Sequence, residues 1–272
     1  MNKIYAVNHY TFIDKIVVKK RQEMCDIINE ALSDSIIQDA LDIGSTNDLD
    51  NKSSNYLIRN LKNIKIYKSI SDQVISNNFF SKCLTKSITE NFSHDEIKSM
   101  RSDLVISNAT IEHVGSFELQ KKMIENMLLL TKKYFIITTP NRYHPLDFHT
   151  KLPFLHWFPK KIHRKLLKLL NMEFFSKEEN LNLLSEKDLT KLLASVGINN
   201  YKIFVLQDIN AWPSADLALQ EAVKIIKKLE LRPNHDEMEK LGNDWIPYRG
   251  AASLFLWHFY NKVKVEKIEI KL

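Results

Sequence analysis

Glycine is scarce in this chain, with five among 272 residues. Loops that cradle phosphates need glycines at fixed spacings, and neither G-x-G-x-x-G nor G-x-x-x-x-G-K-[ST] occurs in the sequence. The usual dinucleotide and triphosphate loops are therefore excluded.

Cysteines and long apolar runs are also few. Cys25 and Cys83 lie far apart and belong to no C-x-x-C pattern, so the sequence predicts neither a disulfide framework nor a zinc site. No run approaches the roughly 20 apolar residues that span a bilayer, and the first residues lack the apolar core of a signal peptide. We expect a cytoplasmic protein that is soluble or at most peripheral to a membrane.

Charge of neither sign dominates the sequence. The formal net charge is +6, but acidic and basic residues are interspersed through most of the chain. No recognised DNA- or RNA-binding motif is present, so we expect no nucleic-acid partner. With 44% hydrophobic residues, the chain can bury a large core with appendages. We expect an N-terminal helical extension over 1–35, a core over 36–212 with a lid-like insertion at 140–180, and a C-terminal segment over 213–272.

What the chain does have is a short apolar run, 40–43, that ends in a glycine turn. The run contains Asp42, and Gly44, Ser45 and Thr46 follow. Glycine permits positive φ and a close approach of a ligand to the backbone, and open α/β sheets bind ligands where their strands end. The stretch predicts either a site for a small polar ligand or an ordinary turn.

Helical and strand patterns alternate on both sides of this turn. Apolar spacing predicts helices over 10–32, 117–130, 185–197 and 214–230, with another that begins at Ser53 or Ser54. It predicts strands over 40–43, 64–70, 83–88, 103–109, 134–139, 201–206 and 263–272. Alternating strands and helices form parallel sheets through right-handed crossovers. We predict a doubly wound α/β fold with a mostly parallel sheet, helical appendages and an antiparallel edge strand at 263–272.

A second stretch, DLVISNATIEH at 103–113, is a buried strand followed by a Glu-His pair. It resembles the class I S-adenosylmethionine-dependent methyltransferases, in which the fourth strand ends beside the methyl donor and a Glu-His pair opens the next loop. The turn after residue 43 resembles motif I of the same family. About sixty residues separate Gly44 from Asp103, which leaves room for two βα units.

A third stretch extends the resemblance. The letters TPNRYHPLDFHT at 139–150 and LHWFP at 155–159 are similar to a bacterial subgroup of these enzymes that carries TPNR-x-x-P-x-x-x-HT after an IEHVG loop. Here the loop is at 111–115. The resemblance covers about residues 40–205.

The resemblance implies S-adenosylmethionine (SAM) as the cofactor. The positions that correspond to donor-binding residues of the family are Asp42, Gly44, Thr46, Asn108 and Ala109. Two acids that are usual in the family are missing from this chain. Asp72 is the nearest substitute for the carboxylate that holds the ribose, and 85–87 has no acid to face the adenine.

Histidines are the candidates for a catalytic base. Methyl transfer is an in-line displacement that depends mainly on positioning, and a base is needed only when the acceptor must lose a proton. The candidates His113, His144 and His149 lie in two loops expected to face the ligand. Any single one is more often a histidine hydrogen-bonded in a loop, and three together favour a role for one of them. Glu112 and His113 are similar to an E-x-x-E-H metal pattern, but Ala109 replaces the first acid, so we predict no metal site.

Basic and apolar residues are interleaved over 151–170, which holds six Lys or Arg residues and no acid. Pro159 is typical of a helix start, and a helix from there carries its apolar and its basic residues on largely different faces. Such a helix predicts a lid over an acceptor site that also touches anionic lipid or a nucleotide-linked sugar. The alternative is a surface helix with a solvated basic face.

Together these features predict a SAM-dependent methyltransferase that acts on an oxygen, less readily a nitrogen, of a small-molecule or glycan-type acceptor. Two alternatives stay open. One is a catalytically silent α/β binding or scaffold protein that has lost the donor site, and the other is a peripheral membrane methyltransferase with a lipid-linked substrate.

Overall fold

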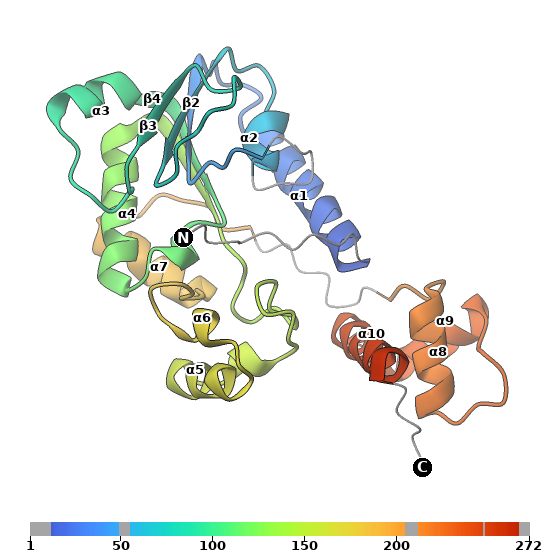
Figure 1. Cartoon of the computed structure of the whole chain (residues 1–272). Coiled ribbons are helices and arrows are strands. Elements are labelled where there is room, and N and C mark those ends of the chain that lie inside the picture. Colours follow the sequence, from blue (N-terminus) through green and yellow to red (C-terminus); the bar gives the residue numbers. More distant parts are fainter. Residues whose placement is uncertain (1–11, 49–54, 205–211, 247, 267–272) are drawn as a thin grey trace. The chain divides into compact units, whose positions relative to one another are not determined.

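The computed structural model describes residues 12–48, 55–204, 212–246 and 248–266 of the chain. The chain divides into two compact units (Figure 1). The first comprises 1–140 and 177–206, and the second comprises 141–176 and 207–272. Among the described helices, none has the length and apolar content to cross a membrane.

The first unit is built on a parallel sheet. Its strands within the described residues are β1 (Asp39–Ile43), β2 (Ile66–Ser71), β3 (Lys82–Thr85), β4 (Ser102–Asn108) and β5 (Thr131–Thr138). Their order is β3-β2-β1-β4-β5, and each neighbouring pair is parallel. The direction of winding reverses between β1 and β4. Open sheets of this kind bind ligands beyond the carboxyl ends of the strands at that reversal.

Helices cover both faces of this sheet (Figure 1). On one face lie α1 (Phe12–Ala31) and α2 (Tyr56–Asn60), and on the other lie α3 (His94–Met100), α4 (Phe117–Leu130) and α7 (Glu186–Ser195). Successive residues of a strand point to opposite faces, so Ala40 packs with the α1 side and Leu41 with the α4 side. Both residues are fully buried. The predicted doubly wound α/β fold is confirmed.

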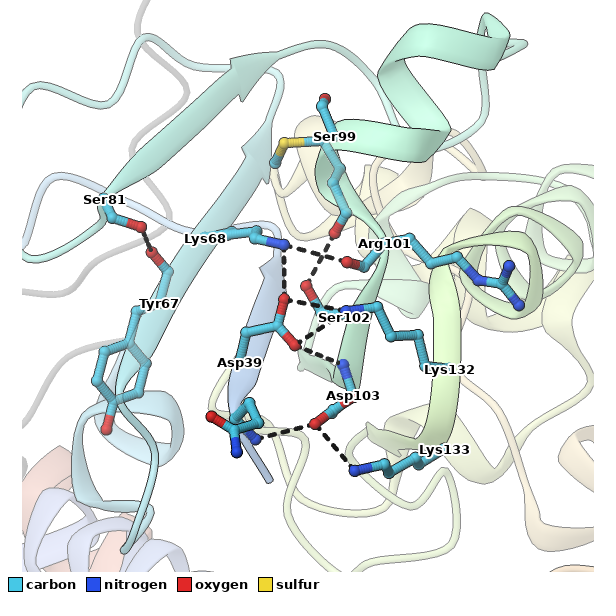
Figure 2. A network of polar contacts seen from close by, with 12 residues as sticks. Asp39, Tyr67, Lys68, Ser81, Ser99, Arg101, Ser102, Asp103, Lys132 and Lys133 are labelled. Atoms are coloured by element: carbon cyan, nitrogen blue, oxygen red, sulfur yellow. Dashed lines mark hydrogen bonds and ion pairs between the residues drawn. The ribbon is translucent and has the colours of Figure 1, made fainter. Parts of the chain in front are cut away.

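Charged groups tie the amino ends of the strands together (Figure 2). Asp39 accepts a hydrogen bond from Lys68 Nζ at 2.7 Å and from the backbone N–H of Asp103 at 2.9 Å, and Lys132 Nζ lies 3.4 Å from it. Asp103 in turn accepts from Lys133 Nζ at 3.1 Å. Burial raises the pKa of the Asp39 carboxyl group, but the contacts with Lys68 and with the Asp103 backbone lower this pKa by more than burial raises it. The pKa is therefore below its ordinary value, and the group stays ionised. This network fixes β1, β2, β4 and β5 at the edge opposite their carboxyl ends.

The second unit is helical. Its described elements are η2 (Leu155–Trp157), α5 (Lys160–Leu169), α6 (Glu173–Ser176), α8 (Leu217–Ile226), α9 (His235–Gly242), η3 (Asn243–Trp245) and α10 (Arg249–Glu266). Buried Leu219, Met238 and Leu256 from α8, α9 and α10 form its core. Trp212 packs against Gly242 and donates its indole N–H to the Met238 carbonyl at 2.8 Å, where a Cβ on the glycine would lie 2.5 Å from the indole nitrogen.

Two predicted strands are wrong where the structure describes them. Residues 263–266 are the last turn of α10, because that helix packs along α8 and continues through the alternating segment instead of joining the sheet as an antiparallel edge. Residues 201–204 form no strand. The rest of both segments, 205–206 and 267–272, lies outside the described residues, as do the expected caps Ser53 and Ser54.

Candidate functional site

The turn after β1 requires glycine for two reasons. Gly44 has φ +85°, and a Cβ on it would lie 2.3 Å from Oγ1 of Thr110. Thr110 donates this hydroxyl to the Ile43 carbonyl at 3.2 Å, while the Gly44 N–H donates to the Ile70 carbonyl at 2.8 Å. The turn is therefore held between the ends of β2 and β4. The group that lies close against Gly44 is the side chain of Thr110.

One asparagine holds the loop that follows. Asn55 is buried; its Oδ1 accepts the N–H of Thr46 at 3.0 Å, and its Nδ2 donates to the carbonyls of Thr46 and Asp48, each at 2.8 Å. Thr46 itself is half-buried. Ser71 closes the other side by donating to the Ser45 carbonyl at 2.8 Å. Asn55 was not among the residues predicted for the site, and its place directly before α2 is the signal that the sequence offers.

Asp42 lies inside the end of β1, not on the surface. Its carboxylate is 5% exposed and accepts the Ser45 hydroxyl at 2.5 Å. Burial raises the pKa of Asp42 to about 7, although the Ser45 hydrogen bond lowers it. Ser69 pairs with Asp42 in the β1–β2 register, and its buried hydroxyl has no hydrogen-bond partner among the described residues. This carboxyl group can hold or release a proton near neutral pH.

The end of β4 places Asn108 and Ala109 beside this turn. Asn108 Oδ1 accepts the Thr138 hydroxyl at 2.6 Å, and the Ala109 N–H donates to the Thr138 carbonyl at 2.9 Å. Ala109 has φ +51°, a conformation that L-residues rarely adopt. Both residues are half-buried, and β5 thus fixes the backbone at the end of β4.

The ends of β2 and β3 differ in charge. Asp72 follows β2 directly and is exposed. After β3, Lys86 pairs with Glu96 of α3 at 2.8 Å and lies over the ring of Phe92. The position after β2 therefore offers a carboxylate to a ligand, and the position after β3 carries a lysine that α3 neutralises.

The loop after β4 contains the 3-10 helix η1 (Ile111–His113), which the returning segment 177–184 holds in place. Glu112 is fully buried and accepts the Thr139 hydroxyl at 2.9 Å. His113 Nδ1 lies 2.7 Å from the carbonyl oxygen of Asn180. A carbonyl only accepts, so Nδ1 carries a proton.

Two buried amides complete this support. Gln120 of α4 donates to the carbonyls of Ile111 and Asn182, at 3.1 and 3.0 Å, and Asn182 donates to the Gly115 carbonyl at 2.7 Å. Neither amide was singled out from the sequence. Asn182 lies 67 residues from the carbonyl that it holds, and Gln120, nine residues from Ile111, reads in the sequence as an ordinary helix residue.

The other two candidate histidines belong to the second unit. His149 Nδ1 lies 3.2 Å from Asp147 Oδ1, and Thr150 donates to the other oxygen of Asp147 at 2.7 Å. Burial raises the pKa of Asp147, but His149 and Thr150 lower it far more, so the carboxylate is ionised. His144 offers its carbonyl to the ring N–H of His156 at 2.7 Å. The three candidate bases are thus divided between the units, with His113 in the first.

The carboxyl edge of the sheet offers small polar groups and few charges. Asp72 supplies an exposed carboxylate, which suits a pair of ribose hydroxyls. Asp42 supplies a carboxyl group that ionises near neutrality, and Ser69 beside it keeps an unused hydroxyl. The turn 44–46 brings backbone groups to the same edge. This set fits a nucleoside with an amino-acid tail, and it lacks the glycine-rich loop that a phosphate chain needs.

Comparisons with known proteins give partial matches. No protein-family model matches the chain. YfjP of Bacillus subtilis (strain 168), named as a DNA-3-methyladenine glycosylase, is 32% identical over 80 residues, which cover 27% of this chain and 28% of YfjP. The alkylbase DNA glycosidase-like protein mag2 of Schizosaccharomyces pombe is 31% identical over 104 residues, 36% of this chain and 48% of mag2. The chain thus spans less than half the length of either curated relative.

Solved structures resemble the chain over more of its length. A cyclopropane-fatty-acyl-phospholipid synthase-like protein from Lactobacillus casei ATCC 334 is 12% identical, with 90% of this chain and 89% of that chain covered and a TM-score of 0.43. Coclaurine N-methyltransferase bound to N-methylheliamine and S-adenosylhomocysteine (SAH) is 14% identical. The match covers 94% of this chain and 72% of that chain, with a TM-score of 0.39. Identities this low carry no information on the reaction or the substrate.

Proposed function

We propose that this chain is a SAM-dependent methyltransferase that methylates an oxygen of a small-molecule or glycan-type acceptor. One observation carries the proposal. The Asp42–Gly44 turn and the Asn108–Ala109 pair end neighbouring strands of a parallel sheet, at the point where the winding reverses. The motif resemblance of both segments adds to this placement.

Each strand end has a role in holding the donor, which supplies an activated methyl group when bound. Asp42, Gly44 and Thr46 line the amino-acid end of the donor. Asp72 binds the ribose hydroxyls as a charged acceptor. Asn108 and Ala109 line the methionine side, where the Thr138 contacts keep their backbone fixed.

His113 is the base that we propose for an oxygen acceptor. Its Nδ1–H donates to the Asn180 carbonyl, so the proton of an acceptor hydroxyl goes to Nε2. The Asn180 carbonyl then stabilises the charged ring that results. His144 and His149 of the second unit are the other two candidates for the base.

Titration calorimetry with S-adenosylhomocysteine (SAH) tests the donor site. We expect a single binding event, and Asp72→Asn to weaken it by about tenfold, since one charged hydrogen-bond acceptor is lost. Asp95→Asn on α3 is the matched control, because it removes another exposed carboxylate and should leave the affinity unchanged. The absence of binding by both SAM and SAH would favour the alternative of a catalytically silent binding or scaffold protein.

Transfer of a labelled methyl group to a panel of hydroxylated small molecules and glycans tests the reaction. With an acceptor in hand, His113→Gln should lower kcat by about 100-fold or more with SAH affinity unchanged. His94→Gln, on the exposed start of α3, is the control. An unchanged kcat for His113→Gln would remove the assignment of the base while leaving the donor site intact.

A further inference from the structure

The helix α5 exposes large apolar side chains, whereas a helix on the surface of a globular protein normally faces such side chains toward the core. Its buried residues are His163 and Leu167. Ile162 is 46% exposed and Leu169 is 78% exposed. The solvated face is therefore not purely basic: an aliphatic strip runs along it.

Exposed large apolar residues also flank the helix in the sequence at both of its ends. Trp157 and Phe158 precede α5 and Leu170 follows it, and each is exposed by 44% or more. Scattered single apolar residues on a surface need no explanation, but a row of large ones on consecutive elements indicates a contact surface. We call the residues Trp157, Phe158, Ile162, Leu169 and Leu170 the apolar strip.

Lysines flank the apolar strip. Lys161, Lys165 and Lys168 are exposed on the adjoining side of α5, and no acidic residue occurs between His149 and Glu173. A hundred degrees per residue places Lys165 between Lys161 and Leu169 around the helix, so charge and apolar surface meet along one line. This arrangement is that of a helix lying in a bilayer interface, with its apolar side chains among acyl chains and its lysines at the headgroups.

We infer that α5 and the apolar strip dock on an anionic lipid surface. The inference is independent of the reaction proposed for the first unit. Charge complementarity selects this occupant: two copies of the face would repel each other, and nucleic acid would leave Leu169 and Leu170 without a contact. Trp157 and the lysines are the residue types that favour the headgroup region.

Sedimentation of the full chain with vesicles tests the docking. We expect binding to vesicles of phosphatidylcholine with about one third phosphatidylserine, weaker binding as salt rises, and little binding to phosphatidylcholine alone. Each lysine near such a surface contributes about fivefold in affinity, so the triple variant Lys161→Gln, Lys165→Gln, Lys168→Gln should bind about 100-fold less tightly.

The matched control neutralises three other exposed lysines in the same way, at Lys62, Lys65 and Lys82 of the first unit, and should bind as the wild type does. The pair Ile162→Ser and Leu169→Ser should weaken binding even at low salt, because it removes aliphatic contacts and no charge. All variants must keep the wild-type melting temperature, as expected for exposed positions.

Three outcomes would overturn the inference. They are the absence of binding to anionic vesicles, an equal loss in the control triple, and a wild-type affinity in the serine pair. Binding of an oligonucleotide that depends on the α5 lysines, without vesicle binding, would assign the face to nucleic acid instead.

Discussion

The buried carboxyl group of Asp42 makes stability depend on pH in the direction opposite to an ion-paired acid. Burial raises the pKa of Asp42 to about 7, despite the hydrogen bond from Ser45. In the unfolded chain the same group ionises at about pH 4. Between these values the folded state keeps a proton that the unfolded state has released. The free energy of unfolding therefore falls as the pH rises from about 4 to about 7.

The variant Asp42→Asn measures this effect. Asparagine is neutral at every pH and keeps an oxygen to accept the Ser45 hydroxyl. One pKa unit corresponds to about 1.4 kcal/mol, so the whole shift amounts to about 4 kcal/mol above pH 7. Entry of water and relaxation of the protein around the ionised carboxylate reduce this free-energy difference. We expect the free energy of unfolding of Asp42→Asn to exceed that of the wild type by about 2 to 4 kcal/mol at about pH 8 and to equal it at about pH 4.

Urea unfolding followed by circular dichroism across this pH range is the assay. An Asp42→Asn advantage that stays constant with pH, or a variant less stable than the wild type at high pH, would refute the reasoning. Ser45→Ala serves as the second variant. It removes the hydrogen bond that favours the ionised form, so the decline of its stability should continue to a higher pH than in the wild type. The asparagine variant should also bind SAH more weakly, which would explain why a destabilising acid stands here.

Three further predictions concern the same sheet, and thermal and urea unfolding checks each of them. Gly44→Ala should destabilise the protein by about 2 kcal/mol or more, because the new Cβ would meet Thr110 and the φ angle at this position is positive. Adding Thr110→Ala to the same chain should recover part of this loss. A loss of stability under about 0.5 kcal/mol for Gly44→Ala would contradict this account of the turn. Lys68→Met should lower the free energy of unfolding by about 1–3 kcal/mol at neutral pH, because it leaves the buried carboxylate of Asp39 with fewer partners. This loss should become smaller as acid protonates Asp39. A loss that does not change with pH would contradict the ion-pair reasoning. Ala109→Val should cost about 1–3 kcal/mol, because a β-branched residue fits positive φ poorly, and an unchanged stability would show that the loop can relax.

The sequence predicted the elements whose local signals agree with their packing. Helix α4 occupies the predicted range 117–130, since Ser116 caps its start and its apolar stripe faces the sheet. Helix α7 follows Ser185, the first residue of the predicted range 185–197, and the Ser185 hydroxyl and Asp188 form a capping box. Gly197, with φ +78°, ends that segment as expected.

Other elements were missed or misplaced, for different reasons. The strict alternation at 263–266 is typical of a strand, but α10 reaches this far because its preceding turns pack on α8. Helix α3 is short and carries a capping box of Ser93 and Glu96, a signal that was overlooked. The expected strand at 83–88 is real but lies at Lys82–Thr85.

The candidate site was predicted in its placement and not in its details. That the segments ending at Gly44 and Asn108 lie side by side is implied by the methyltransferase resemblance, and the structure shows them on the neighbouring strands β1 and β4. That Thr110 fills the space beside Gly44 depends on long-range packing that spacing in the sequence does not report. The hydrogen bonds by which Asn55 and Gln120 fix the loops join residues nine apart, but nothing in the residue types alone indicates them. The exposure of the apolar strip is likewise visible only in the structure.

Hydrogen–deuterium exchange with and without SAH tests the central claim most directly, because it reports binding and its location in one measurement. The account predicts slower exchange in the segments that end β1, β2 and β4, namely 44–48, 71–74 and 108–113. Unchanged exchange at a saturating concentration, or protection confined to the helices α8 to α10, would contradict it.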